Sequence, residues 1–181
     1  MSRFLIATLT ALSLSALMPA MADTQAAPFD LPLDGSCEAI ERHHDILRTT
    51  GGALDFDAFH HLDASTIRFE GLQGLLAVCD AGNDRLVAVE ATFRKRFGGA
   101  TFDSLVDMLR DAGYRQIHVN RPHVGDKSAR FAAGDTTIRL NEPHMSRETT
   151  LSYIAQDYAD ALNQHRIERE RQQREAESGT L

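Results

Sequence analysis

The sequence lacks the short motifs that identify most catalytic and metal-binding sites. It has no G-x-S-x-G or S-x-x-K segment around a nucleophilic serine, no H-E-x-x-H pair of zinc ligands and no Cys-x-x-Cys redox pair. Gly98-Gly99 is not followed by the Lys-Ser or Lys-Thr pair of a phosphate-binding loop. We therefore expect no catalytic residues and no cofactor, and a non-enzyme explains the sequence better than an enzyme does.

Long apolar runs are confined to the N-terminus. Arg3 precedes a largely apolar stretch, residues 4–18, and Ala20-Met21-Ala22 has the Ala-x-Ala pattern of a cleavage site. The stretch is shorter than the roughly 20 residues that span a bilayer. The pattern predicts a signal peptide at residues 1–22, cleaved after Ala22. We expect no membrane span after cleavage, and a protein that is periplasmic or secreted.

Positive charge is scarce relative to negative charge. The chain has 19 Lys and Arg against 26 Asp and Glu, a formal charge of −7, and loss of Arg3 with the signal peptide makes it −8. A protein of this charge repels nucleic acids and anionic membrane surfaces. We therefore expect no nucleic-acid partner.

Cysteine is also scarce, with only Cys37 and Cys79 in the chain. In an oxidising compartment an isolated pair most simply forms one disulfide. The enclosed loop of about 42 residues would stabilise the fold by roughly 4 kcal/mol in the chain-entropy model. Cys37 shares one face of a predicted helix with Ile40, His44 and Leu47, and that face is expected to point inward. A redox pair or two metal ligands are the alternatives.

Composition divides the chain into four parts. Residues 1–22 form the predicted signal peptide, and residues 23–35, with several alanines and prolines, are expected to be a flexible leader. A single α+β domain is expected at residues 36–167. The Arg-, Glu- and Gln-rich residues 168–181 predict a charged, disordered tail, with a helix that docks on a partner as the alternative.

Hydrophobic periodicity predicts the elements of the domain. Helices are expected at 37–49, 101–112 and from about 156 onward, and strands at 66–70, 75–79, 86–95, 116–120, 127–132, 135–141 and 149–154. In one strand the alternate residues Val87, Val89, Ala91 and Phe93 are all apolar, so this set is expected to face the core. The short connections favour one antiparallel sheet, formed by a hairpin, a helix and then a meander, and covered on one face by helices.

Histidine doublets are the weak candidates for metal ligands: His43, His44, His60 and His61. Adjacent residues of a helix diverge by about 100°, so one doublet does not chelate one ion. A site that takes one histidine from each doublet is possible if the glycine turn between them folds the two segments together. We favour ordinary surface or core-edge roles, and therefore no metal.

Two further features are weak as sites. The Asp55-Phe56-Asp57 segment lacks most of a calcium loop. The basic run 94–96 is expected to be a solvated strand end, and Asp103 would oppose a phosphate at the start of the helix that follows Gly98-Gly99.

We expect an exported, non-enzymatic binding protein, comparable to an inhibitor or an immunity protein. Its open sheet face or its meander loops would bind a protein partner or a small ligand. A histidine-mediated metal-binding protein, or an enzyme whose site is assembled only in three dimensions, is the alternative. The sequence does not indicate an oligomeric state.

Overall fold

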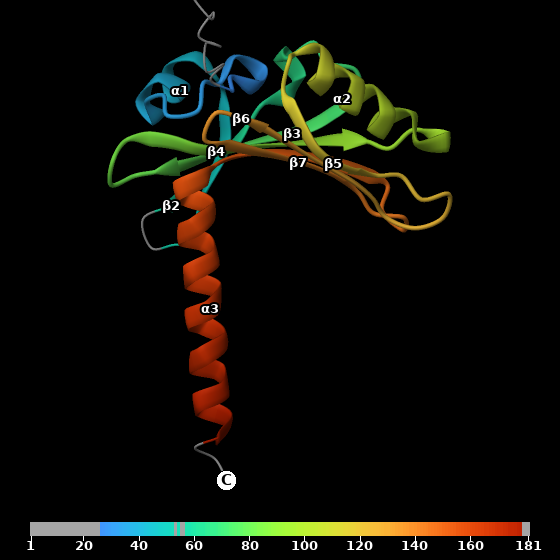
Figure 1. The fold of residues 1–181 in the computed structure, drawn as a ribbon. Helices are drawn as coiled ribbons and strands as arrows, with labels where there is room; N and C mark the ends of the chain where they lie inside the picture. Colours follow the sequence, from blue (N-terminus) through green and yellow to red (C-terminus); the bar gives the residue numbers. More distant parts are fainter. Residues whose placement is uncertain (1–25, 53, 55–56, 179–181) are drawn as a thin grey trace, which may run out of the picture.

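The computed structural model describes residues 26–52, 54 and 57–178. The predicted signal peptide lies outside the described residues. The long elements are α1 (Cys37–His43), β1 (Ile46–Gly51), β2 (Asp57–Leu62), β3 (Leu72–Asp80), β4 (Arg85–Arg94), α2 (Ala100–Asp111), β5 (Arg115–Asn120), β6 (Lys127–Ala133), β7 (Thr136–Glu142), β8 (Glu148–Ala155) and α3 (Gln156–Ser178) (Figure 1). Short 3-10 helices occur at Pro28–Asp30, Ala64–Thr66 and Phe97–Gly99.

All eight strands form one antiparallel sheet in the order β1-β2-β3-β4-β8-β7-β6-β5. The fold is therefore mixed α+β, as expected. Each half of the sheet is a helix followed by a four-strand meander, and the last strands of the two halves, β4 and β8, pair at the centre. The sequence predicted the hairpin of β3 and β4 and a further strand at 66–70 before α2, whereas the structure places β1 and β2 ahead of that hairpin and no strand at 66–70.

Helices α1 and α2 lie on the same face of the sheet, and the main core is packed beneath them (Figure 1). Helix α2 contributes the apolar stripe that its sequence predicted, with Phe102, Leu105, Val106 and Leu109 all buried. Gly113 follows the helix with a φ of +81°, a left-handed conformation that favours glycine at a helix C-terminus.

The N-terminal segment and α1 are fastened to the first half of the sheet. The predicted disulfide between Cys37 and Cys79 is present and joins α1 to β3. Residues 26–35, which we expected to be a flexible leader, include Leu31 and Leu33, both almost fully buried in the main core. The apolar residues of this segment thus belong to the core.

Two predicted elements near α1 are wrong. The first helix ends at His43, and His44 is already extended, with φ −128° and ψ 141°. Residues 46–50 include three β-branched side chains, which favour the strand β1 that they form. Leu47, expected to face inward on a helix, is 69% exposed on this strand. Residues 66–70 were predicted as a strand, but the chain there leaves a 3-10 helix and enters a loop.

The predicted core face of β4 is correct for three residues of four. Val89, Ala91 and Phe93 lie in the main core, but Val87 packs on the opposite face with the start of α3. The cause is a β-bulge, because Cys79 pairs with Leu86 and Val78 pairs with Ala88, so the register passes over Val87.

Helix α3 begins at Gln156 as expected, but it does not cover the sheet. It projects from the face opposite α1 and α2, and Tyr158 is its only buried residue among those described (Figure 1). The Tyr158 hydroxyl donates to buried Asp57 at 2.8 Å, and Arg85 pairs with Asp157 at 2.6 Å, so the root of the helix is anchored.

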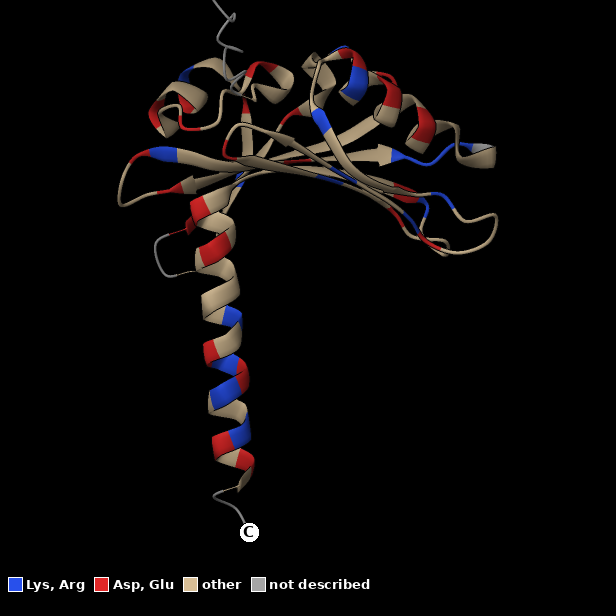
Figure 2. Ribbon diagram, viewed as in Figure 1, with Lys and Arg blue, Asp and Glu red and all other residues tan. Residues whose placement is uncertain are grey.

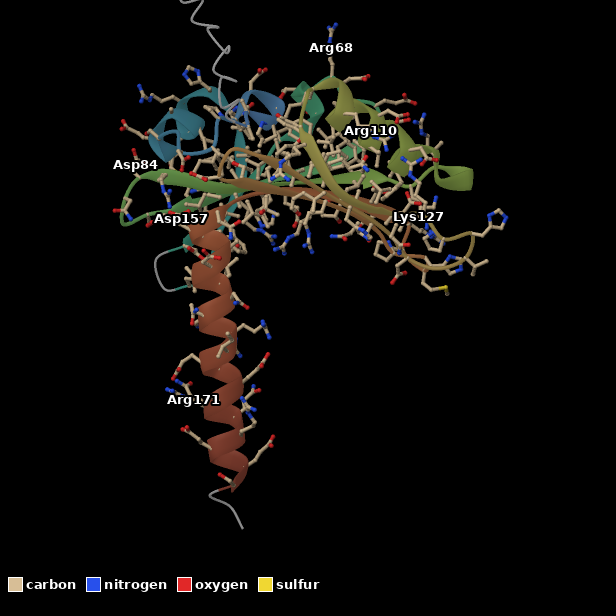
Figure 3. All side chains as sticks on the ribbon, in the orientation of Figure 1. Arg68, Asp84, Arg110, Lys127, Asp157 and Arg171 are labelled. Atoms are coloured by element: carbon tan, nitrogen blue, oxygen red, sulfur yellow. A yellow bond between two sulfur atoms is a disulfide. The ribbon has the colours of Figure 1, made fainter. Side chains whose placement is uncertain are left out.

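Beyond its root α3 carries closely spaced charges of both signs (Figure 2). Residues 168–178, expected to be disordered, continue the helix. Arg171, far from the root in Figure 3, pairs with Glu168 and Glu175, and such pairs one turn apart support an exposed helix. None of the helices in the described part of the chain combines the length and the apolar character needed to cross a membrane.

Candidate functional site

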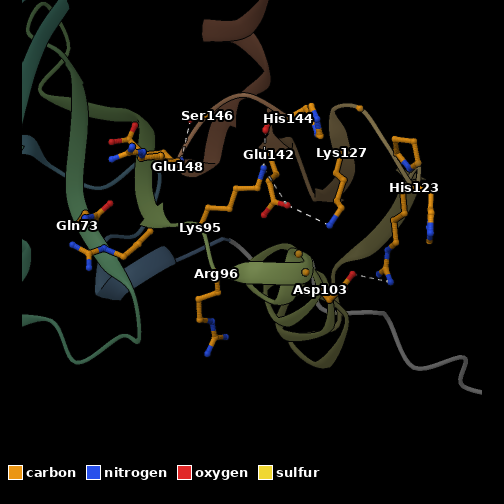
Figure 4. Close-up of a pocket in the computed structure, with 17 residues that line it drawn as sticks. Gln73, Lys95, Arg96, Asp103, His123, Lys127, Glu142, His144, Ser146 and Glu148 are labelled. Atoms are coloured by element: carbon orange, nitrogen blue, oxygen red, sulfur yellow. Dashed lines mark hydrogen bonds and ion pairs between the residues drawn. The ribbon is translucent and has the colours of Figure 1, made fainter.

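A pocket of 1320 Å³ opens where the second half of the sheet meets the start of α2 (Figure 4). We call it the α2 pocket. Its walls come from the end of β4, the Gly98-Gly99 turn, the 121–126 loop between β5 and β6, and the 143–147 loop between β7 and β8. Six Lys or Arg residues and three Asp or Glu residues line it: Arg94, Lys95, Arg96, Arg121, Lys127 and Arg147, with Asp103, Glu142 and Glu148.

The floor of the α2 pocket is built around Glu142, which is 1% exposed. Thr149, also fully buried, donates its hydroxyl to Glu142 Oε2 at 2.8 Å. Lys127 Nζ lies 3.3 Å and Lys95 Nζ 4.0 Å from Glu142 Oε1. A buried carboxylate needs such partners because an unpaired charge in a protein interior is very costly. Two ammonium groups share one carboxylate, which leaves one positive charge uncompensated.

Gly99 allows Lys127 to reach this position. Its φ of +82° favours glycine, and a Cβ atom added there would collide with the Lys127 ammonium group. The same ammonium lies 5.8 Å from the centroid of the Phe102 ring, within the range of a cation–π contact. The turn before α2 and the apolar stripe of α2 thus hold Lys127 over the pocket floor.

Asp103, which we expected to oppose an anion at the start of α2, has a basic partner in the structure. Arg121 pairs with Asp103 at 3.1 Å, so this acidic side chain in the first turn of α2 is neutralised. Arg94 and Arg147 line the pocket as well, and neither forms an ion pair with a described residue. The pocket therefore has a surplus of positive charge, although the protein as a whole is acidic.

The basic run 94–96 is more than a solvated strand end. The side chain of Lys95 is only 23% exposed, and its Nζ donates to the carbonyl oxygens of Pro143 and His144 at 3.1 and 3.3 Å. The His144 amide in turn donates to Asp126 Oδ1 at 2.7 Å. These bonds connect the 121–126 and 143–147 loops to the end of β4, so the pocket wall is fixed on several sides.

The histidine doublets are not brought into one site. His43 and His44 border a groove of 560 Å³ on the helix-covered face. His60 and His61 point to opposite faces of β2, where His60 Nδ1 contacts Thr49 Oγ1 at 3.0 Å and His61 Nε2 contacts Arg48 at 3.1 Å. Among the residues that the structure describes, no group of three or more His, Cys, Asp or Glu residues is arranged to hold a metal ion.

Sequence reasoning missed Glu142, Thr149 and Lys127. The alternation of β7 carried a usable signal, because Ile138 and Leu140 point inward and Glu142 continues the same face. An acidic residue at an inward strand position requires partners, and here these partners, Thr149, Lys127 and Lys95, are brought together only in the folded chain.

The floor of the α2 pocket, with two ammonium groups on one carboxylate, is suited to holding a further negative charge.

Comparisons of the chain with protein-family models, with curated proteins and with solved structures gave no match. The chemistry of the site is therefore the basis for assigning a function.

Proposed function

We propose that the protein is an exported, non-enzymatic binding protein that holds a small anionic ligand in the α2 pocket. One observation supports the ligand class: the ammonium groups of Lys95 and Lys127 share the carboxylate of Glu142, which leaves a positive charge uncompensated. Arg147 lines the same pocket and has no acidic partner among the described residues. Carboxylate and phosphate groups are the ordinary ligands of such clusters, because charge-assisted hydrogen bonds are strong.

Export is supported by two independent features. The N-terminal sequence has the three-part pattern of a signal peptide, and the Cys37–Cys79 disulfide is typical of periplasmic and secreted proteins. The ligand is accordingly a molecule of the cell envelope or of the surroundings.

Binding fits the polar groups of the pocket better than catalysis does. Glu142 accepts a bond from Thr149 and faces two ammonium groups, so it is not placed as a free general base. The Ser146 hydroxyl accepts a hydrogen bond from the Glu148 amide at 3.0 Å, which stabilises the turn of its own loop.

The proposal is tested by calorimetry with citrate and inorganic phosphate as probes. We expect saturable binding of at least one probe to the mature protein, with at least a tenfold loss of affinity in Arg147→Gln. Arg147 is exposed, so this variant should fold normally. Lys127→Gln should also lose binding, and its fold is checked separately because Glu142 then loses a partner.

Arg110→Gln is the matched control, because Arg110 is an exposed arginine on α2 outside the pocket. The control should bind as the unmodified protein does. The proposal is overturned if neither anion binds, or if Arg147→Gln and Arg110→Gln bind equally well. Turnover of a substrate by the unmodified protein, lost when Glu142 is substituted, would show that the pocket is catalytic and would overturn the proposed binding function.

A further inference from the structure

The open face of the sheet, opposite α1 and α2, is organised in rows that follow from the strand register. Residues directly opposite one another on neighbouring strands point to the same face, with strands about 4.8 Å apart. One row crosses all eight strands: Arg48, His61, Leu76, Glu90, Ser152, Arg139, Arg130 and His118. Side chains that end in nitrogen project from this face beside α3 (Figure 3).

Arg130 and Arg139 are the unusual members of this row. They are direct partners on β6 and β7, both are exposed, and neither forms an ion pair or a side-chain hydrogen bond with another described residue. Like charges directly opposite each other destabilise a sheet. Neither neighbour in the row supplies a negative charge to the two arginines. Arg130 is flanked by His118, and Arg139 is flanked by Ser152, whose hydroxyl donates to Glu90 at 3.2 Å.

A second row beside the arginines consists of neutral hydrogen-bonding side chains. Its members are Thr92, Thr150, Asn141, Ser128 and Asn120, which are register partners in that order across β4, β8, β7, β6 and β5. On the other side of the arginines a groove of 590 Å³ separates the sheet from α3, and Arg130, Arg139 and Arg166 line it. Arg166 is already paired with Glu170 at 2.6 Å, and Asp160 is the one acidic residue in the lining, so Arg130 and Arg139 leave the groove with a surplus of positive charge.

We propose that this open face binds an acidic polysaccharide, with its carboxylates on Arg130 and Arg139 and its hydroxyl groups on the neutral row. Charge complementarity commits the surface to an anion, because two adjacent guanidinium groups without partners stand on a protein of net charge −7. The neutral row favours a ligand that carries hydroxyl groups along its length, since Asn, Ser and Thr side chains both donate and accept hydrogen bonds.

Other polyanions fit the face less well. Single-stranded nucleic acid is usually held by large aromatic side chains on which its bases stack, and neither of the two rows contains Phe, Tyr or Trp. An acidic peptide offers carboxylates but few hydroxyl groups for the neutral row. The proposal concerns residues outside the α2 pocket, so it does not depend on the function proposed above.

The test measures binding of polygalacturonate to the mature protein by calorimetry at low salt. We expect binding that weakens as salt rises and that is at least tenfold weaker in the double variant Arg130→Thr/Arg139→Thr. Threonine is suited to strands, so the variant should fold. A structural role predicts a lower melting temperature for this variant, whereas a binding role predicts an equal or higher one, because the like-charge contact is gone.

The matched control is Arg68→Thr/Arg110→Gln, which removes the same charge from the helix-covered side (Figure 3). It should bind polygalacturonate as the unmodified protein does, and so should Arg147→Gln in the α2 pocket. Equal losses in both double variants, or a loss confined to Arg147→Gln, would overturn the proposal. Binding of polyglutamate or of single-stranded DNA as tight as that of polygalacturonate would reject the polysaccharide, and neutral dextran should not bind.

Discussion

The two halves of the sheet share one element order but hold their helices in different ways. Helix α1 has seven residues and buries only Cys37 and Ile40, and the disulfide fastens it to β3. Helix α2 has 12 residues, buries five of them and lies outside the disulfide. A short helix buries little apolar surface, so a covalent link replaces packing there, whereas a full apolar stripe is sufficient in the second half.

The halves also differ in the charge that they expose. On the open face the first half contributes Phe59, Val78 and Ala88, which pack against the root of α3. The second half carries the opposed arginines of β6 and β7 and, of the basic residues in the α2 pocket, Arg121, Lys127 and Arg147; the end of β4 supplies the other three. The second half thus takes part in both charged surfaces, whereas the first half contributes to the α2 pocket through the end of β4.

The largest expected effect comes from breaking the disulfide of the first half. Replacing both Cys37 and Cys79 with alanine should lower the free energy of unfolding by about 4 kcal/mol, because the unfolded chain regains the freedom of the closed loop. Urea denaturation of the oxidised protein and of the variant measures this. A loss below about 1 kcal/mol would mean that packing alone holds α1, and the contrast between the halves would disappear.

A smaller loss is expected from opening a cavity in the second half. Leu109 is fully buried in the stripe of α2, and Leu109→Ala should cost about 3 kcal/mol, within the range for buried leucines. Met108→Ala, at a partly buried position of the same helix, is the control and should cost less. The same substitution is then made in the variant without cysteines. If the two halves are independent, the losses in the free energy of unfolding should add; if α2 depended on the disulfide as α1 does, Leu109→Ala would cost nothing further.

The root of α3 provides a third comparison, because it is held by polar contacts. Tyr158→Phe removes the hydrogen bond to buried Asp57, whose Oδ1 already has no partner among the described residues, and should cost about 1–3 kcal/mol. Urea denaturation near pH 7 measures the loss. Unchanged stability would show that the hydrogen bond to Asp57 does not hold α3, and would leave its apolar contacts and the Arg85–Asp157 ion pair as the anchors.

The same tyrosine gives the protein an alkaline pH dependence. Burial, with the hydrogen bond to Asp57, raises the pKa of Tyr158 above its ordinary value. The folded state therefore holds this proton more tightly than the unfolded chain, so the stabilisation is complete below about pH 10 and is lost as the pH rises through the folded-state pKa. Above about pH 10 the stability of the unmodified protein should therefore fall more steeply with pH than that of Tyr158→Phe. Burial also raises the pKa of Tyr153, but this residue is present in both proteins and does not affect the difference between them.

The sequence predicted the second half better than the first for a physical reason. The elements from α2 to β8 have clear periodicity and turn residues, such as Gly113 and Gly134, and the structure contains all of them. In the first half Leu47 continued the period of the predicted helix, the apolar residues of 54–62 fit neither period, and β2 is held between β1 and β3 by pairing with both. Local preference could not reveal contacts made between distant segments.

The candidate surfaces were less predictable than the fold. Lys95 follows β4, Lys127 begins β6 and Glu142 ends β7, and the three meet only because these ends of the strands lie beside α2. The opposed pair Arg130 and Arg139 requires the register of a hairpin, which the Gly134 turn fixes, so this pair could have been derived from the sequence with an exact register. The projection of α3 was missed because Leu162 and His165 were expected to face inward and the charged residues 168–181 were expected to be a disordered tail, whereas the helix continues to Ser178.

The smallest effect is expected where the chain has least packing. A chain that ends at His165 lacks the distal part of α3, in which none of the described residues 166–178 is buried. Its ion pairs, such as Arg166 with Glu170, are exposed and contribute little, so the free energy of unfolding should change by less than about 0.5 kcal/mol while circular dichroism reports fewer helical residues. A loss above about 1 kcal/mol that depended on protein concentration would show that the distal helix packs against a second copy. An unchanged stability would place the packing of α3 in its first turns, where Tyr158 and Leu162 meet the first half of the sheet.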